Sequence, residues 1–221
     1  EPGQYGFVDR IYLTGEETPG GSVFALDVDE KVLWAAPALG VGKWENAVPL
    51  DLPELNKTHV IVLLGDDTPQ APLYLYVGEK NQSEDASFLD RNGLVEGKLY
   101  IWKSDDNSIN PENFKGTGAI RNGVFILLDN HSPDPIEPEN YDELGYAKPA
   151  YLKKQQISGG AFQFSRPEDL ATNPNNGSQL VYASTGGSSA ANGDFWGTTY
   201  LIDVNITIDK ILNDQIEASL Q

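Results

Sequence analysis

The sequence predicts an all-β protein. About ten short runs are rich in Val, Ile, Leu, Tyr and Phe, and each is bounded by Gly, Pro, Asn or Asp, which is the pattern of short strands joined by turns. Helical patterns are few and do not alternate with the strands, so a doubly wound parallel sheet is not expected. The remaining architectures are a sandwich, a barrel or a propeller.

The expected helices, loops and strands follow from these apolar runs and the polar segments between them. A helix is expected over residues 208–220, and 167–171 are expected to form one helical turn. The polar segments 104–122 and 130–158 are interpreted as loop insertions within one domain spanning 1–221. Strands are expected over residues 5–13, 22–26, 31–35, 59–64, 73–77, 98–103, 123–128, 160–164, 180–184 and 198–204.

A weak internal repeat favours the propeller among the three architectures. Residues 73–77, 97–103 and 199–203 each carry aromatic side chains at the centre of an aliphatic strand. Propeller blades leave a repeat of this kind in a sequence, although the spacing here is irregular. We therefore expect a β-propeller with long polar loops.

The composition limits the partners. The net charge of −18 argues against nucleic acid and anionic membranes, because both require a basic face. The same charge suits divalent cations. The chain has no cysteine, which excludes disulfides and thiolate ligands. No apolar run approaches the roughly 20 residues of a membrane helix. Because the chain begins at Glu1, we expect a processed or excised segment.

Four short acidic signatures are the candidate site. They occur far apart in the sequence and next to apolar strands, and hard cations take several oxygen ligands gathered from different segments. The signatures are Thr14-Gly15-Glu16-Glu17, Trp44-Glu45-Asn46, Gly65-Asp66-Asp67 and Arg166-Pro167-Glu168-Asp169.

The order of these and three further motifs resembles the PhoX-type alkaline phosphatases, and looks closest to their divergent relatives. The resemblance covers about residues 5 to 204. No single motif is decisive, but their shared order is fairly specific. The further motifs are Leu73-Tyr74-Leu75-Tyr76-Val77-Gly78-Glu79-Lys80, Gly93-Leu94-Val95-Glu96-Gly97-Lys98-Leu99-Tyr100 and Trp196-Gly197.

The resemblance implies a β-propeller that hydrolyses phosphate monoesters outside the cytoplasm at a site of calcium and iron ions. It assigns metal-binding carboxylates to six positions. Metal ions in such a site clamp the oxygens of the phosphoryl group, and Arg166 or Lys80 would help to neutralise its charge. The six implied metal ligands are Glu16, Glu17, Glu45, Asp66, Asp67 and Glu168.

Two departures from the family pattern shape the expectation. The family has an iron-binding cysteine before the Glu pair, where this chain has Gly15. Calcium sites made only of oxygen ligands are therefore still expected. An iron pair bound as in the family would lack its cysteine ligand. The length supplies about four to five blades at roughly 40 to 50 residues each, so we expect an incomplete propeller, completed by another chain or chain segment.

Three of the signatures also have a structural interpretation. The Glu16-Glu17 pair could be a solvated turn, Asp66-Asp67 a simple Asx-type turn, and Arg166 with Glu168 a structural ion pair. His59 is expected to be packed within a strand. His131 is expected to be exposed in a polar loop. Three functions stay open: a calcium-dependent phosphomonoesterase, a non-catalytic calcium-binding propeller that acts as an interaction module, and a metal-free structural subunit.

Overall fold

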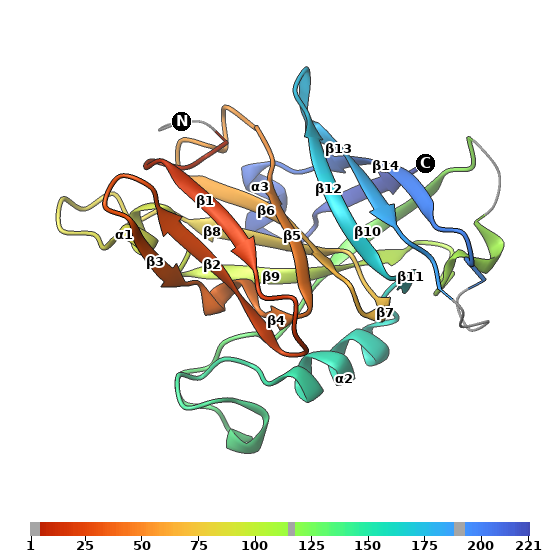
Figure 1. Ribbon diagram of the computed structural model, residues 1–221, viewed down its shortest axis with the longest axis horizontal. Helices are drawn as coiled ribbons and strands as arrows, with labels where there is room; N and C mark the ends of the chain where they lie inside the picture. The colour runs from red at the N-terminus through yellow and green to blue at the C-terminus, as the bar shows by residue number, and fades with distance from the viewer. Residues whose placement is uncertain (1–4, 115–117, 188–192) are drawn as a thin grey trace.

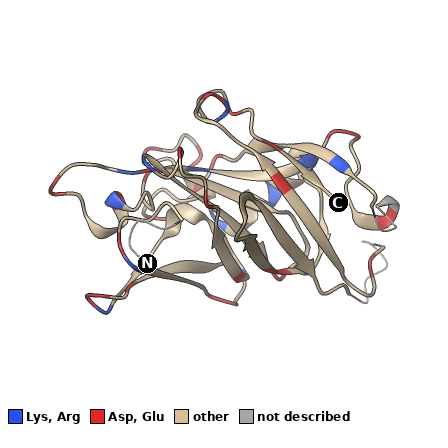
Figure 2. Ribbon diagram, turned by 90° about the horizontal axis from the view of Figure 1, so that it is seen from above, with Lys and Arg blue, Asp and Glu red and all other residues tan. Residues whose placement is uncertain are grey.

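The computed structural model describes residues 5–114, 118–187 and 193–221. Strands account for most of the regular structure in these residues, so the all-β prediction is confirmed. Acidic residues lie mostly on the loops and turns, and basic residues are fewer (Figure 2). Among the described residues no helix is long and apolar enough to cross a membrane.

The largest element is an antiparallel sheet of nine strands (Figure 1). Its strands follow one another mainly as hairpins, and β15 lies between β14 and β10, where it joins the last part of the chain to its middle. In spatial order the strands are β12 (Pro167–Asn173), β13 (Asn176–Ser184), β14 (Thr198–Asn205), β15 (Glu217–Leu220), β10 (Arg121–Leu127), β9 (Gly97–Ser104), β8 (Tyr74–Glu79), β6 (His59–Asp66) and β5 (Trp44–Pro49).

The two outer strands of this sheet, β12 and β5, lie against each other, so the sheet curls into a nearly closed barrel. Asn46 donates from its side chain to the carbonyl of Leu170 at 3.4 Å, and Thr172 Oγ1 donates to the carbonyl of Pro49 at 2.7 Å. Gly65 makes this approach close, because a Cβ there would lie 2.3 Å from the Glu168 carbonyl oxygen. The curvature brings the end of β6 and the beginning of β12 together.

Alternating residues of β6 pack into two separate hydrophobic cores, one on each face of the sheet. Ile61 and Leu63 contribute to the core inside the curled sheet, with Trp102, Phe164 and other large side chains. The intervening residues of β6 pack into the second core, under the smaller sheet and α2. A strand buried on both faces reads as a continuous apolar run, which is why 59–64 were predicted well.

Two smaller sheets complete the strand structure. One contains β1 (Ile11–Gly15), β2 (Gly21–Asp27) and β3 (Val32–Ala35) in that order, with β4 (Val41–Gly42) paired to β2. The strand β1 packs beside β5 of the large sheet. The other pairs β7 (Pro69–Ala71) with β11 (Phe164–Ser165). This short pair holds two chain segments of the candidate site beside each other.

The helices are short, and one of them lies where a loop insertion was predicted. The polar segment 130–158, expected as a loop insertion, contains most of α2 (Pro149–Gly159), which covers the second core through Leu152. Proline at the first helical position is compatible with helix initiation because its missing N–H has no partner there. The other helices are α1 (Phe88–Arg91), α3 (Ile208–Leu212), and the single turns η1 (Pro37–Leu39), η2 (Pro111–Asn113) and η3 (Pro138–Asn140).

Two further predictions were wrong about the type of element. Residues 167–171 belong to strand β12, because their backbone pairs with β13. The helix expected over 208–220 stops at Leu212, and Asp214 then turns the chain with a φ of 53°. The last residues form β15, which fills the place between β10 and β14. In both segments pairing with distant strands overrides the local pattern.

The remaining differences concern the extent of strands. The strand expected over 5–13 is β1 alone, and that expected over 160–164 is reduced to β11. The loop 104–122 ends where β10 begins at Arg121, and residues 115–117 of it lie outside the described part of the chain. The Trp44 segment forms β5, a strand that was not predicted.

Candidate functional site

The acidic signatures meet where β6 ends and where β5 and β12 begin. Trp44 and Asp66 are paired across β5 and β6, and Asp67 follows directly. The register shifts between Trp44 and Asn46, which leaves Glu45 without a partner residue in the ladder. An unpaired residue of this kind in a β-bulge turns its side chain away from the normal alternation. The bulge thus gives Glu45 its place at the site.

Asp67 is the centre of the site, and its side chain is only 3% exposed. Arg166 donates from Nε to Oδ1 at 2.9 Å and from Nη2 to Oδ2 at 3.3 Å, and Lys43 Nζ donates to Oδ2 at 2.5 Å. Burial raises the pKa of Asp67, but the hydrogen bonds from Arg166 and Lys43 outweigh it and hold the pKa below its ordinary value. Asp67 therefore stays ionised between two cations.

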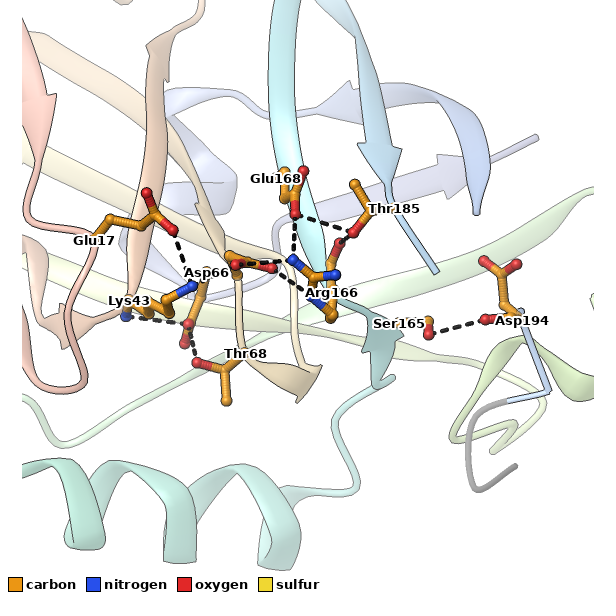
Figure 3. A network of polar contacts seen from close by, with 10 residues as sticks. Glu17, Lys43, Asp66, Thr68, Ser165, Arg166, Glu168, Thr185 and Asp194 are labelled. Atoms are coloured by element: carbon orange, nitrogen blue, oxygen red, sulfur yellow. Dashed lines mark hydrogen bonds and ion pairs between the residues drawn. The ribbon is translucent and has the colours of Figure 1, made fainter. Parts of the chain in front are cut away.

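Lys43 joins the first signature to this centre. Its ammonium also donates to Glu17 Oε1 at 3.0 Å, and the bonds to Asp67 and Glu17 raise the pKa of Lys43 above its ordinary value. Its backbone is held by Asp66, whose Oδ1 accepts from the Lys43 N–H at 3.1 Å and from the Thr68 hydroxyl. Figure 3 shows Glu17, Lys43 and Asp66 converging from different segments. Burial raises the pKa of Asp66 despite these bonds.

Arg166 is directed at Asp67 by a turn between β11 and β12. Its φ is +56°, a left-handed conformation that is costly for a non-glycine residue. Its Nη2 also donates to Glu168 Oε1 at 3.0 Å, and Thr185 Oγ1 donates to the same oxygen at 3.0 Å (Figure 3). Burial is the main cause that raises the pKa of Glu168. The arginine is thereby fixed by two carboxylates while its side chain remains 41% exposed.

Three carboxylates lie close enough to hold a cation. Glu17, Glu45 and Asp67 each offer an oxygen, and these oxygens lie within 4.8 Å of one another. Burial and repulsion from Glu17 and Asp67 raise the pKa of Glu45. Within the described part of the chain Glu45 has no hydrogen-bond or ion-pair partner. A set of carboxylate oxygens suits a hard cation such as calcium, which takes six to eight oxygen ligands at about 2.3–2.6 Å.

Thiolate-held iron does not fit this chain. There is no cysteine in the sequence, and Gly15 lies so close to β5 that an added Cβ would be 2.2 Å from the carbonyl oxygen of Trp44. A side chain at this position would require β1 and β5 to move apart. The same close approach brings the Glu17 segment to Lys43 and Glu45.

The structure brings together five of the predicted site residues. Asp66 lies beside them as a support for the Lys43 backbone. Glu16 instead accepts from the Ser22 N–H at 3.2 Å within its own hairpin. Lys80 is at the other end of β6, where its ammonium donates to the carbonyl of Asn56. The five are Glu17, Glu45, Asp67, Arg166 and Glu168.

Lys43 and Thr185 are the main residues that sequence reasoning missed. Lys43 comes directly before the Trp44-Glu45-Asn46 signature, so its position was the available signal. Thr185 belongs to the glycine-rich run after β13, which carries no acidic signature. Part of that run, residues 188–192, lies outside the described residues.

The fold and the cluster define the structural class: an all-β protein with an acidic cluster that contains a half-exposed arginine. The sequence matches the family described as Alkaline phosphatase PhoX over residues 4–204. The chain belongs to this family.

A solved structure supports the same relationship at the level of fold. Pseudomonas fluorescens PhoX, solved in complex with vanadate, a transition state analogue, is similar with a TM-score of 0.59 and 18% sequence identity. The match covers 90% of this chain and 35% of that chain. The PhoX fold is a β-propeller, so the predicted fold class is confirmed for the matched part. No curated protein matches the chain in sequence.

Proposed function

We propose that this chain carries the site of a phosphate ester hydrolase, a phosphomonoesterase that uses calcium. The proposal is supported by membership of the PhoX family. The observation that carries it is the position of Arg166, whose guanidinium is anchored on Asp67 and Glu168 yet half exposed beside three carboxylates. This arrangement combines a binding group for phosphate oxygens with ligands for a hard cation.

Arg166 would bind and orient the phosphoryl group. Its Nε and Nη2 are committed to Asp67 and Glu168, which fixes the plane of the guanidinium. Nη1 then remains for the substrate, and a planar guanidinium of fixed direction binds phosphate oxygens with little loss of entropy. Thr185 acts through Glu168, because its hydroxyl holds the carboxylate that positions the arginine.

Glu17, Glu45 and Asp67 would hold the cation. Calcium there would act as a Lewis acid on the phosphoryl oxygens. Lys43 occupies oxygens of two of these carboxylates, so it competes with a cation for the same ligands. Displaced from them, its ammonium becomes available to the anionic substrate. Lys80 has no part in this proposal, because it lies at the opposite end of β6.

Hydrolysis of p-nitrophenyl phosphate tests the proposal. The full chain should release nitrophenol in millimolar calcium, lose that activity when the cation is chelated, and regain it when calcium is restored. An Asp85→Gln variant should show the same calcium-dependent activity as the unchanged chain, because Asp85 is an exposed acidic residue far from the site signatures in sequence. A chain that shows no calcium-dependent turnover contradicts the enzymatic proposal.

A second candidate is a non-catalytic calcium-binding module. The observation that favours it is the pairing of Arg166, whose guanidinium already donates to both Asp67 and Glu168. An arginine whose charge is compensated in this way has less need of a substrate anion. This candidate predicts that calcium raises the thermal midpoint of unfolding through ligand linkage, without hydrolysis of any ester.

The partner and the location belong to the same proposal. The chain corresponds to 35% of the PhoX chain that it matches, and we propose that another chain or segment supplies further blades. The edge strand β3 supports this, because Val32, Leu33 and Trp34 are all exposed on it, and unpaired apolar edges favour strand addition. An extracytoplasmic location follows the family and is tested by cell fractionation.

A further inference from the structure

A groove of about 440 Å³ lies between β1 and β5, directly beside the carboxylate cluster. Glu45 lines the groove and is also one of the three clustered carboxylates. Gly15 lines it as well, at the point where β1 makes its close approach to Trp44. Through Glu45 the groove therefore adjoins the carboxylate cluster.

Apolar and aromatic side chains make up much of the lining. Aromatic side chains contribute large contact areas, and they prefer to pack against other rings. The volume also falls in the range of pockets that bind small organic molecules, roughly 300–1,000 Å³. The larger apolar lining residues are Tyr5, Phe7, Ile11, Tyr12, Leu13 and Pro49.

The charge of the groove restricts its ligand further. Its charged lining residues are Asp9 and Glu45, and the described lining includes no lysine or arginine. Asp9 is balanced by Arg91, whose Nε donates to it at 2.6 Å, but Glu45 lacks such a partner among the described residues. A second negative group on the substrate would therefore meet repulsion here and no compensating cation.

We propose that this groove binds the alcohol portion of the phosphate ester, and that it selects neutral aromatic or apolar alcohols. The inference rests on the proposed hydrolase function and adds the substrate class to it. Arg166 holds the phosphoryl group at the cluster, and the aryl group extends past Glu45 between β1 and β5. Esters with an anionic alcohol portion, such as carboxylated phosphates, are disfavoured by the carboxylate at the entrance.

Two pairs of esters test this selection by kcat/KM. The value for 1-naphthyl phosphate should exceed that for phenyl phosphate, which has a similar leaving group, by about fivefold for the added ring contact. Phenyl phosphate should exceed 4-carboxyphenyl phosphate, because the two differ mainly in the added negative charge. Equal values within both pairs overturn the inference and leave the hydrolase proposal standing.

Substitutions locate the selection in the groove. Tyr12→Ala and Tyr5→Ala, both at exposed aromatic residues, should lower kcat/KM for 1-naphthyl phosphate about fivefold or more and should lower the value for glycerol 2-phosphate less, because glycerol offers no ring to the groove. Leu212→Ala removes an exposed apolar side chain from α3, outside the groove, and should change neither. An equal loss for both esters in the Tyr12 and Tyr5 variants contradicts a role in selection.

A binding experiment separates the two proposals if no ester is turned over. Fluorescence titration of 1-naphthol in the presence of a chelator measures the groove without phosphate or cation. Saturable binding that is weakened by Tyr12→Ala supports the groove as an aryl site even when the hydrolase proposal fails. Absence of binding, or binding that Tyr12→Ala does not change, overturns the inference.

Discussion

The two ends of β6 use basic side chains in different ways. At the His59 end, Lys80 donates to the carbonyl of Asn56, and burial lowers the pKa values of both Lys80 and His59. Within the described residues no carboxylate forms an ion pair with Lys80. At the Asp66 end, Lys43 and Arg166 are instead paired with carboxylates, which raise the pKa of each.

This difference separates a structural cation from a candidate functional one. Lys80 satisfies a backbone acceptor, and burial lowers its pKa. Arg166 keeps its charge, is fixed in direction and remains partly exposed, which are the properties required to bind an anion. The placement of a basic residue within the fold therefore contributes to its role beside its residue type.

The largest expected effect on stability comes from Asp67→Asn. The buried carboxylate would no longer accept charge-assisted hydrogen bonds from Arg166 and Lys43, and their loss costs about 2–3 kcal/mol. Chemical denaturation measures this loss. Asp85→Asn, at an exposed position, should change the free energy of unfolding by less than about 0.5 kcal/mol. Similar values for the two variants would falsify the central role of Asp67.

Gly15→Ala tests the close approach of β1 to β5, which brings the Glu17 segment to the site. Because a Cβ would lie 2.2 Å from the Trp44 carbonyl oxygen, the strands must separate, at a cost of about 1–3 kcal/mol. Gly159→Ala is the matched control, since a Cβ there meets only ordinary contacts at 3.8 Å. The control should be neutral or slightly stabilising. A Gly15 variant as stable as the control would show that β1 and β5 are not tightly packed.

Lys43→Gln tests whether the ammonium competes with a cation. Without divalent ions the variant should have a lower thermal midpoint, because Glu17 and Asp67 lose their shared donor. Calcium should then stabilise the variant more than the unchanged protein. The control is Lys57→Gln, at an exposed pair with Glu54, whose response to calcium should match that of the unchanged protein. Equal calcium shifts in all three proteins contradict competition at Lys43.

Glu45→Gln should have the smallest effect on the free energy of unfolding, and it should raise this free energy at neutral pH. The pKa of Glu45 is raised above 4.5 in the folded protein, so the folded state holds a proton more tightly than the unfolded state. Its ionisation therefore removes stability as pH rises from about 4.5 through the raised pKa. At pH 7 without calcium the variant should be more stable by less than about 1 kcal/mol. Thermal unfolding between pH 4 and 8 measures the difference, and a less stable variant at pH 7 contradicts the repulsion.

Much of the fold could be predicted from the sequence because the buried strands have strong local patterns. Segments such as β6 and β9 are apolar on both faces and are bounded by turns. Elements held by distant pairing were missed or misassigned: β12 has the composition of a helical turn, and β15 was expected to be helical. Their structure depends on neighbours that lie far away in the sequence.

The candidate site was predictable to the extent that its residues occur in ordered motifs. Glu17, Glu45 and Asp67 were expected from those motifs and lie within one cluster. Lys43 was missed because a single lysine carries no spacing signal. Lys80 was overvalued because its strand motif is strong, while the antiparallel register that places it at the far end of β6 cannot be read from that motif.

The rate of phosphate ester hydrolysis in Arg166→Gln and Lys80→Gln tests the central claim most directly. Both substitutions remove one positive charge, and each is measured with p-nitrophenyl phosphate at saturating calcium. The account predicts that Arg166→Gln lowers kcat/KM by about a hundredfold or more, while Lys80→Gln stays within about threefold of the unchanged protein. Full activity in the Arg166 variant, or a comparable loss in the Lys80 variant, would contradict it.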